Sequence, residues 1–91
     1  MYNFSLSVKF KKDYKKIKRN PNFNKEKLEE VFNILKKGIN LDDKYKNHKL
    51  SGDYVGCLEF HLKPDILVIY KIDKIKNTIY LIRLGSHSEL F

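Results

Sequence analysis

Residues 66–84 read ILVIYKIDKIKNTIYLIRL, and this stretch decides the fold. Two runs rich in β-branched and aromatic residues, 66–73 and 78–84, flank the polar segment 74–77. That pattern is typical of two strands joined by a tight turn. Because so short a connection joins antiparallel strands, the stretch predicts a β-hairpin.

Two further strands are predicted upstream of this hairpin. Residues 55–62 alternate, with Cys57, Glu59 and His61 on one face and hydrophobic residues on the other, and residues 63–65 form a turn into the hairpin. The N-terminal residues 2–8 alternate in the same way. Alternation with a period of two is the pattern of a half-buried strand.

The segment between these strands predicts two helices. Apolar residues recur at helical spacing across 10–19 and again across 25–37. Asn24 is a suitable N-terminal cap for the second helix and Gly38 a suitable stop. We expect the two helices to form a hairpin, followed by an ordered loop over residues 39–53, which is long for a chain of this size.

The order βααβββ predicts one α+β domain over residues 1–91, with a twisted, mainly antiparallel sheet and two helices packed on one of its faces. The sequence lacks an apolar run long enough to cross a bilayer and a recognisable secretory signal. Its single cysteine, Cys57, excludes a disulfide framework and a thiolate metal cluster. We therefore expect a cytoplasmic protein.

The charge points to a polyanionic partner. The chain has 19 Lys and Arg against 11 Asp and Glu, a formal net charge of +8, and such an excess favours nucleic acid. The alternative is a lysine-rich solvated surface, since only Arg19 and Arg83 are arginines. The outer face of the helix over 10–19 is strongly basic and fits both interpretations.

The three histidines lie at predicted element ends or in loops: His48, His61 and His87. A zinc site formed by them is one alternative, because imidazole is a favoured zinc ligand. The i, i+4 spacing of His61 and Asp65 would join two ligands on a helix, but Pro64 places them in a strand turn. We therefore predict neither a metal nor a cofactor.

Histidine, aspartate and arginine together suffice for metal-independent RNA cleavage. RNA carries its own nucleophile, the 2′-hydroxyl, beside each phosphodiester. Imidazole can act as acid or base near neutral pH, and a guanidinium can hold phosphate through two hydrogen bonds. The predicted products are a 2′,3′-cyclic phosphate and a 5′-hydroxyl.

Two stretches resemble a known family. NHKLSGDYVGCLEFHLKPDILVIYKI (47–72) and LIRLGSHSELF (81–91) are similar to the YafQ branch of the RelE/ParE superfamily, the toxins of bacterial type II toxin-antitoxin systems. The motifs His-x-Leu-x-Gly, His-x-x-Pro-Asp, and Arg-x-Gly-x-His followed by a terminal Leu-Phe carry this resemblance. One departure is Ile66, where some relatives have tryptophan, so a stacking role at that position is not expected to carry over.

The resemblance implies a ribosome-dependent messenger-RNA interferase that enters the ribosomal A site and cuts the message within codons. Its functional residues, transferred by position, are His48, His61, Asp65, Arg83, His87 and Phe91. His87 would be the general acid and Arg83 the phosphate clamp. His48, His61 and Asp65 would serve the base and orientation side, without the sequence deciding which of them takes the proton.

The resemblance also implies a cognate antitoxin that dimerises, binds operator DNA and covers a monomeric toxin, for which we expect a segment rich in Asp and Glu over the basic site. Two other functions stay open: a gyrase-inhibiting toxin of the ParE type, and a non-catalytic RNA-binding protein. Within GSHSELF (85–91) we expect Gly85 to provide a sharp turn. Phe91 would then lie against the site or fill the core.

Overall fold

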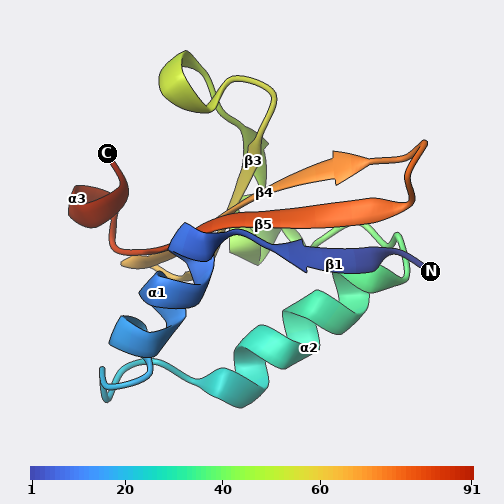
Figure 1. Cartoon of the computed structure of the whole chain (residues 1–91). Coiled ribbons are helices and arrows are strands. Elements are labelled where there is room, and N and C mark those ends of the chain that lie inside the picture. Colours follow the sequence, from blue (N-terminus) through green and yellow to red (C-terminus); the bar gives the residue numbers. More distant parts are fainter.

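The structure, a computed structural model, describes all residues from 1 to 91 as one five-stranded sheet flanked by helices (Figure 1). The strand order is β1-β5-β4-β3-β2. None of the helices combines the length and apolar character that a membrane crossing requires. The elements are β1 (Asn3–Leu6), α1 (Val8–Ile17), α2 (Lys25–Lys36), β2 (His48–Lys49), β3 (Leu58–Lys63), β4 (Ile66–Asp73), β5 (Thr78–Gly85) and α3 (His87–Leu90).

The predicted hairpin is confirmed as β4 and β5, which pair antiparallel from Asp73 opposite Thr78 to Leu67 opposite Gly85. A bulge between Ile69 and Tyr70 shifts the register. β3 is antiparallel to β4, whereas β1 pairs parallel with β5 at the edge of the sheet. The prediction of a mainly antiparallel α+β sheet is therefore confirmed.

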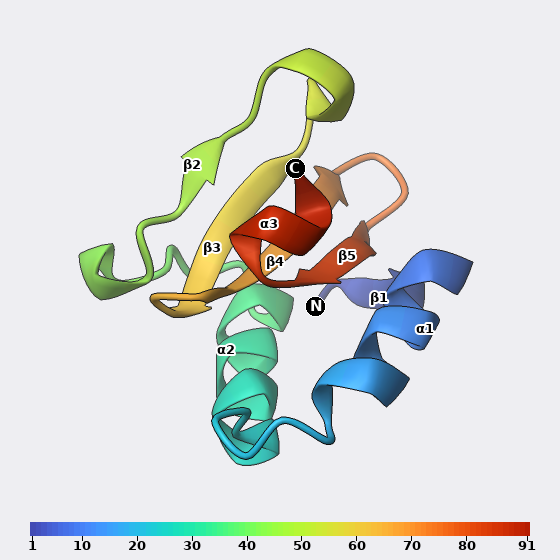
Figure 2. The same ribbon diagram turned by 90° about the vertical axis from the view of Figure 1, so that its left-hand side faces the viewer.

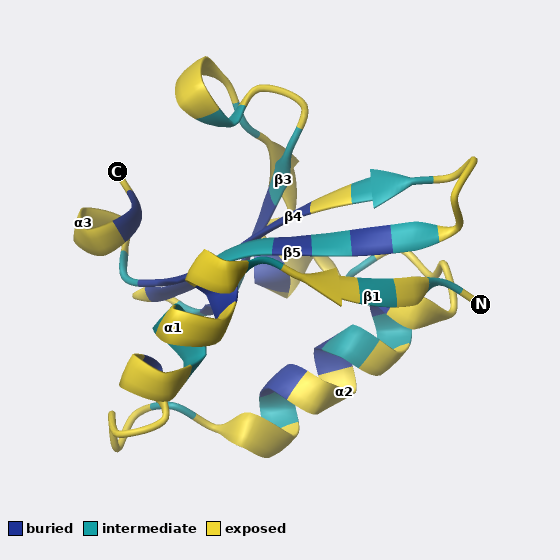
Figure 3. Cartoon of the chain, in the orientation of Figure 1, coloured by how far each residue is buried: buried dark blue, intermediate teal, exposed yellow.

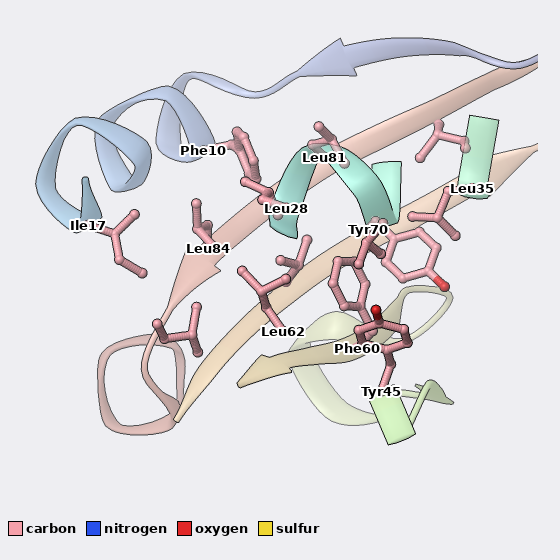
Figure 4. Packing of buried hydrophobic residues seen from close by; sticks show 14 residues of the cluster. Phe10, Ile17, Leu28, Leu35, Tyr45, Phe60, Leu62, Tyr70, Leu81 and Leu84 are labelled. Atoms are coloured by element: carbon pink, nitrogen blue, oxygen red, sulfur yellow. The ribbon is translucent and has the colours of Figure 1, made fainter. Parts of the chain in front are cut away.

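The predicted helices α1 and α2 cover one face of the sheet and enclose the main core (Figures 1 and 4). Phe10 from α1 and Val31 from α2 are 2% and 0% exposed, and they belong to one cluster with the inward residues of β3, β4 and β5. Colouring by burial shows the outward surfaces of both helices exposed (Figure 3). α1 begins before the predicted residue 10 because the Ser7 hydroxyl accepts a hydrogen bond from the Phe10 amide.

The opposite face of the sheet carries α3, which lies over the end of β5 (Figure 2). Its Leu90 packs on Leu67 and Ile69 in a small second cluster. This helix was not predicted from the sequence. A local signal for it exists, since Ser86 and Glu89 form a capping box of the type that starts helices.

Several predicted boundaries were wrong. The strand expected over 55–62 begins only at Leu58, because a 3₁₀ turn over Gly52–Tyr54 and the left-handed Gly56 (φ 88°) occupy the preceding residues. The loop over 39–53 contains a second 3₁₀ turn, Asp43–Tyr45, and the short edge strand β2. This strand places His48 opposite Glu59 of β3.

Gly85 does not have the left-handed backbone expected of a sharp turn, because its φ angle is not positive. It is the last residue of β5. A Cβ built there would lie 3.3 Å from Glu89 Oε1 and 3.5 Å from Leu90 Cδ2. The requirement for glycine is therefore the close packing of α3 against the strand.

Candidate functional site

The face of the sheet under α3 brings residues from three strands into two rows. Glu59 on β3 pairs with Ile69 on β4, which pairs with Arg83 on β5. In the next row His61 pairs with Leu67, which pairs with Gly85. Neighbouring strands lie about 4.8 Å apart, so each row spans roughly 10 Å. Polar groups from β3 and β5 thus flank an apolar floor on β4.

Glu59 is the polar centre of the first group. Its side chain is only 5% exposed, and its Oε1 lies 3.1 Å from His61 Nε2 and 3.5 Å from His48 Nε2. The Nδ1 of His48 contacts the Lys46 carbonyl at 2.7 Å, which fixes the orientation of that ring. A carboxylate shielded from water and flanked by two imidazoles can accept, pass and hold a proton.

Arg83 forms the second group with a residue of α1. Its Nε and Nη2 donate to the two carboxylate oxygens of Asp13 at 2.7 and 3.1 Å, and the Leu84 amide donates to Asp13 Oδ2 at 3.0 Å. The Asp13 carboxylate raises the pKa of the Arg83 guanidinium, and Tyr54 adds to this effect. One edge of the guanidinium is therefore occupied by Asp13, and the side chain remains 20% exposed.

His87 and Phe91 form the third group, on α3. Their rings are stacked with centroids 4.9 Å apart, and Phe91 meets Tyr54 edge to face at 5.5 Å. Phe91 is 53% exposed, whereas Leu90 beside it is 6% exposed. Leu90 is therefore the residue of the tail that fills the core, and the Phe91 ring is available to a ligand.

Asp65 lies apart from the histidine pair. It is exposed in the turn between β3 and β4 and borders a hollow of about 650 Å³ beside α1. His61 borders a different hollow, of about 290 Å³. Of the six residues taken from the resemblance, the structure thus joins His48 with His61 and His87 with Phe91, whereas Arg83 and Asp65 stand in other surroundings.

Three residues of these groups were missed by the sequence analysis: Glu59, Asp13 and Tyr54. Glu59 had a signal, because it precedes His61 by two residues and shares its strand face. Asp13 had none, since its partner Arg83 is 70 residues away in the chain. Tyr54 stands in a loop whose path the alternation of the sequence does not determine.

The histidine pair and Glu59 also have the donor set of a cation site. One ligand atom from each of His48, Glu59 and His61 lies within 4.8 Å of the others. A pair of metal ligands was not expected from His61 and Asp65. The structure instead brings His61 and Glu59 of β3 together with His48 of β2, so Glu59 supplies the carboxylate. Imidazole and carboxylate donors suit zinc and copper.

Comparison with known proteins agrees with the predicted resemblance. The family described as "Bacterial toxin of type II toxin-antitoxin system, YafQ" matches residues 2–91. A protein of Escherichia coli strain K12 named "mRNA interferase toxin YafQ" is 33% identical over 98% of this chain and 95% of its own.

Solved structures give the same result. A metal-bound toxin from Helicobacter pylori is 45% identical, with a TM-score of 0.91 over 100% of both chains. The E. coli DinJ-YafQ complex contains a chain that is 27% identical, with a TM-score of 0.86 over 100% of this chain and 99% of that one. The chain thus belongs to the YafQ family of toxins from bacterial type II toxin-antitoxin systems.

Proposed function

We propose that this toxin is a messenger-RNA interferase, an endoribonuclease that cleaves its substrate on the ribosome through attack by the 2′-hydroxyl. The observation that carries the proposal is the pairing of a shielded carboxylate with two imidazoles on the sheet face that also carries α3 with the exposed His87. The names of its relatives support the same activity. Relatives from E. coli are called interferases and share the whole length of the chain.

The two sides of the site divide the proton transfers. Glu59, held against His61 and His48, forms the base side, which removes the proton from the 2′-hydroxyl. His87 on α3 is the general acid, which protonates the departing 5′-oxygen. The bond between the 2′-oxygen and phosphorus forms while the bond from phosphorus to the 5′-oxygen breaks, so a 2′,3′-cyclic phosphate and a 5′-hydroxyl result.

Arg83 stabilises the negative charge that develops on the phosphoryl oxygens. It does so with the N–H donors that Asp13 does not occupy, while Asp13 holds the Nε–Nη2 edge of the guanidinium. The exposed Phe91 ring provides a surface on which a base of the RNA stacks. Asp65, at the rim of the neighbouring hollow, orients the substrate outside the proton-transfer group.

The partner that silences this toxin is an antitoxin protein, as the complex formed by the E. coli relative supports. The net charge of +8 favours an antitoxin segment rich in Asp and Glu. We place this segment over the face that carries His61, Arg83 and His87. Protection of these side chains from chemical modification in the complex, with exposure in the free toxin, is the expected result.

Metal binding is a second property favoured by a specific observation. The H. pylori relative is described as metal-bound, and His48, Glu59 and His61 here present suitable donors. An ion held by them would engage the atoms that proton transfer requires. We therefore expect added Zn²⁺ or Cu²⁺ to inhibit cleavage, and chelation of transition metals with Mg²⁺ retained for the ribosome to leave cleavage intact.

The test of the proposed function is cleavage of a defined message on purified ribosomes, with mapping of the new RNA ends. Wild-type toxin should yield 2′,3′-cyclic phosphate and 5′-hydroxyl ends, and His87→Gln should be folded but slower by about 10² to 10⁴, the usual contribution of general acid catalysis. RNA that is bound but left intact would favour the non-catalytic alternative. Inhibition of gyrase with intact RNA would favour the ParE-type alternative.

A further inference from the structure

A hollow beside the C-terminal segment 85–91 has no part in the proton transfers described above. It has a volume of about 650 Å³ and opens between the end of α1, the turn from β3 to β4 and the start of α3. Its apolar floor includes Ile17, Ile66 and Leu84, which are buried.

The charges around the hollow are of two kinds. Lys16 is engaged with Glu89 and Asp13 with Arg83, so these charges are neutralised by their partners. Arg19 is exposed and Lys63 partly exposed, and neither takes part in any of the ion pairs of the chain. Asp65, also exposed and unpaired, adds one negative charge, so two free positive groups and one free negative group leave the rim net positive.

The hollow also continues directly from the proposed site. Leu84 follows Arg83, and Gly85 and Ser86, which precede His87, form part of the wall. An RNA strand whose scissile phosphate lies between Arg83 and His87 therefore reaches this hollow with an adjacent nucleotide. A patch of surface lysines alone would lack both this continuity and the apolar floor.

We propose that the hollow is a nucleotide subsite for the RNA strand, next to the scissile phosphodiester. The base lies on the apolar floor, and Arg19 and Lys63 contact the phosphate of that nucleotide. This combination suits RNA, because an apolar surface accepts the face of any base and a guanidinium binds phosphate through charge-assisted hydrogen bonds. The inference rests on the proposed function and names where its substrate continues beyond the cut.

The test uses the full chain with His87→Gln, which slows cleavage during the measurement by about 10² to 10⁴. Binding of a single-stranded oligoribonucleotide is followed by fluorescence anisotropy at several salt concentrations, with and without the double substitution Arg19→Gln and Lys63→Gln. Because both residues contact one phosphate, their loss should lower the slope of log affinity against log salt by roughly 0.7, the contribution of one neutralised phosphate of a single strand.

The matched control is Lys71→Gln with Lys74→Gln, which removes the same charge at exposed positions of the β4–β5 hairpin. This end of the hairpin lies away from α3 (Figure 1). The control should keep its affinity for the oligoribonucleotide within about twofold of the His87→Gln chain, because long-range electrostatics are screened beyond roughly 10 Å at ordinary salt. Equal losses in the two double variants, or no loss at the hollow, would overturn the subsite.

Two further measurements separate this inference from its rivals. If the hollow variant lost affinity for polyglutamate while keeping its affinity for RNA, the hollow would belong to an acidic protein partner, and the proposal would be wrong. In the chain that retains His87, the double variant should raise KM for ribosome-dependent cleavage with little change in kcat. A wild-type chain that never cleaves RNA, together with hollow-dependent RNA binding, would refute the proposed enzyme and leave the subsite standing.

Discussion

Replacement of Glu59 by glutamine separates the chemistry of the site from its structure. Glutamine has nearly the same size and keeps an oxygen that can accept the hydrogen bond from His61, now 3.1 Å from Glu59 Oε1. It carries no negative charge and cannot take up a proton. If the buried carboxylate belongs to the base side, ribosome-dependent cleavage should fall by about 10² to 10⁴, the range typical of general acid–base catalysis.

The stability of the variant should change little, because two effects oppose each other. Weakening one hydrogen bond to a charged group costs about 1 kcal/mol when the acceptor is retained. Removing a charge from a position where the side chain is 5% exposed relieves a desolvation penalty, which offsets that cost. A net change below about 1 kcal/mol corresponds to less than roughly 4–8 °C in Tm for a domain of this size.

The assay compares single-turnover cleavage of a message on ribosomes with thermal unfolding of the same preparations. Glu26→Gln is the matched control, since Glu26 is an exposed glutamate in the first turn of α2. The control should cleave at the wild-type rate. A folded Glu59→Gln protein that cleaves within about threefold of wild type would refute the role given to this carboxylate, because proton transfer by a positioned group contributes at least about 10².

Other changes test the remaining groups. Arg83→Lys should cleave RNA more slowly by about 10² or more, because lysine lacks the planar guanidinium fork. The variant should also unfold more easily, because lysine cannot make both hydrogen bonds to the Asp13 carboxylate. Cleavage at the wild-type rate would make Arg83 purely structural. Deleting Phe91 should leave Tm near the wild-type value but weaken RNA binding by the loss of about 1–3 kcal/mol of stacking. Leu90→Ala should instead cost about 2 kcal/mol or more of folding stability. A loss of stability without Phe91 and an unchanged Tm for Leu90→Ala would exchange the roles of the two residues. The hydrogen bond from Lys16, with those from Ser86, lowers the pKa of Glu89 to about 2. Stability from Glu89 is therefore present above pH 4.5 and lost as pH falls towards 2, and Glu89→Gln should flatten this part of the unfolding profile measured with denaturant.

The elements of this fold could largely be predicted because local periodicity determines them. The hairpin over 66–84 and both helices follow from alternation, helical spacing and caps. The parallel pairing of β1 with β5 could not be predicted, because nothing in residues 2–8 specifies which distant strand they join. α3 was missed because a helix of four residues shows no periodicity, although its capping box was present.

The site was harder to predict, since its groups form across strands. Motif spacing identified His48 and His61, but only the register of the short β2 strand brings both to Glu59. The pair of Arg83 with Asp13 depends on how α1 crosses β5, which no local pattern records. A resemblance transfers positions one by one, whereas the shielding of a carboxylate or the occupation of a guanidinium edge arises from packing.

The C-terminal residues show why packing and chemistry are combined in so short a segment. Leu90 anchors α3 on Leu67 and Ile69, and the lack of a side chain at Gly85 allows this close approach. The helix therefore has a fixed position. The buried Leu90 holds in place the exposed residues His87, at the start of the helix, and Phe91, directly after it. In the role of general acid proposed for it, His87 must be held close to the optimal geometry to be effective. One leucine in a small second core thus provides a rigidity that four helical residues alone would not have.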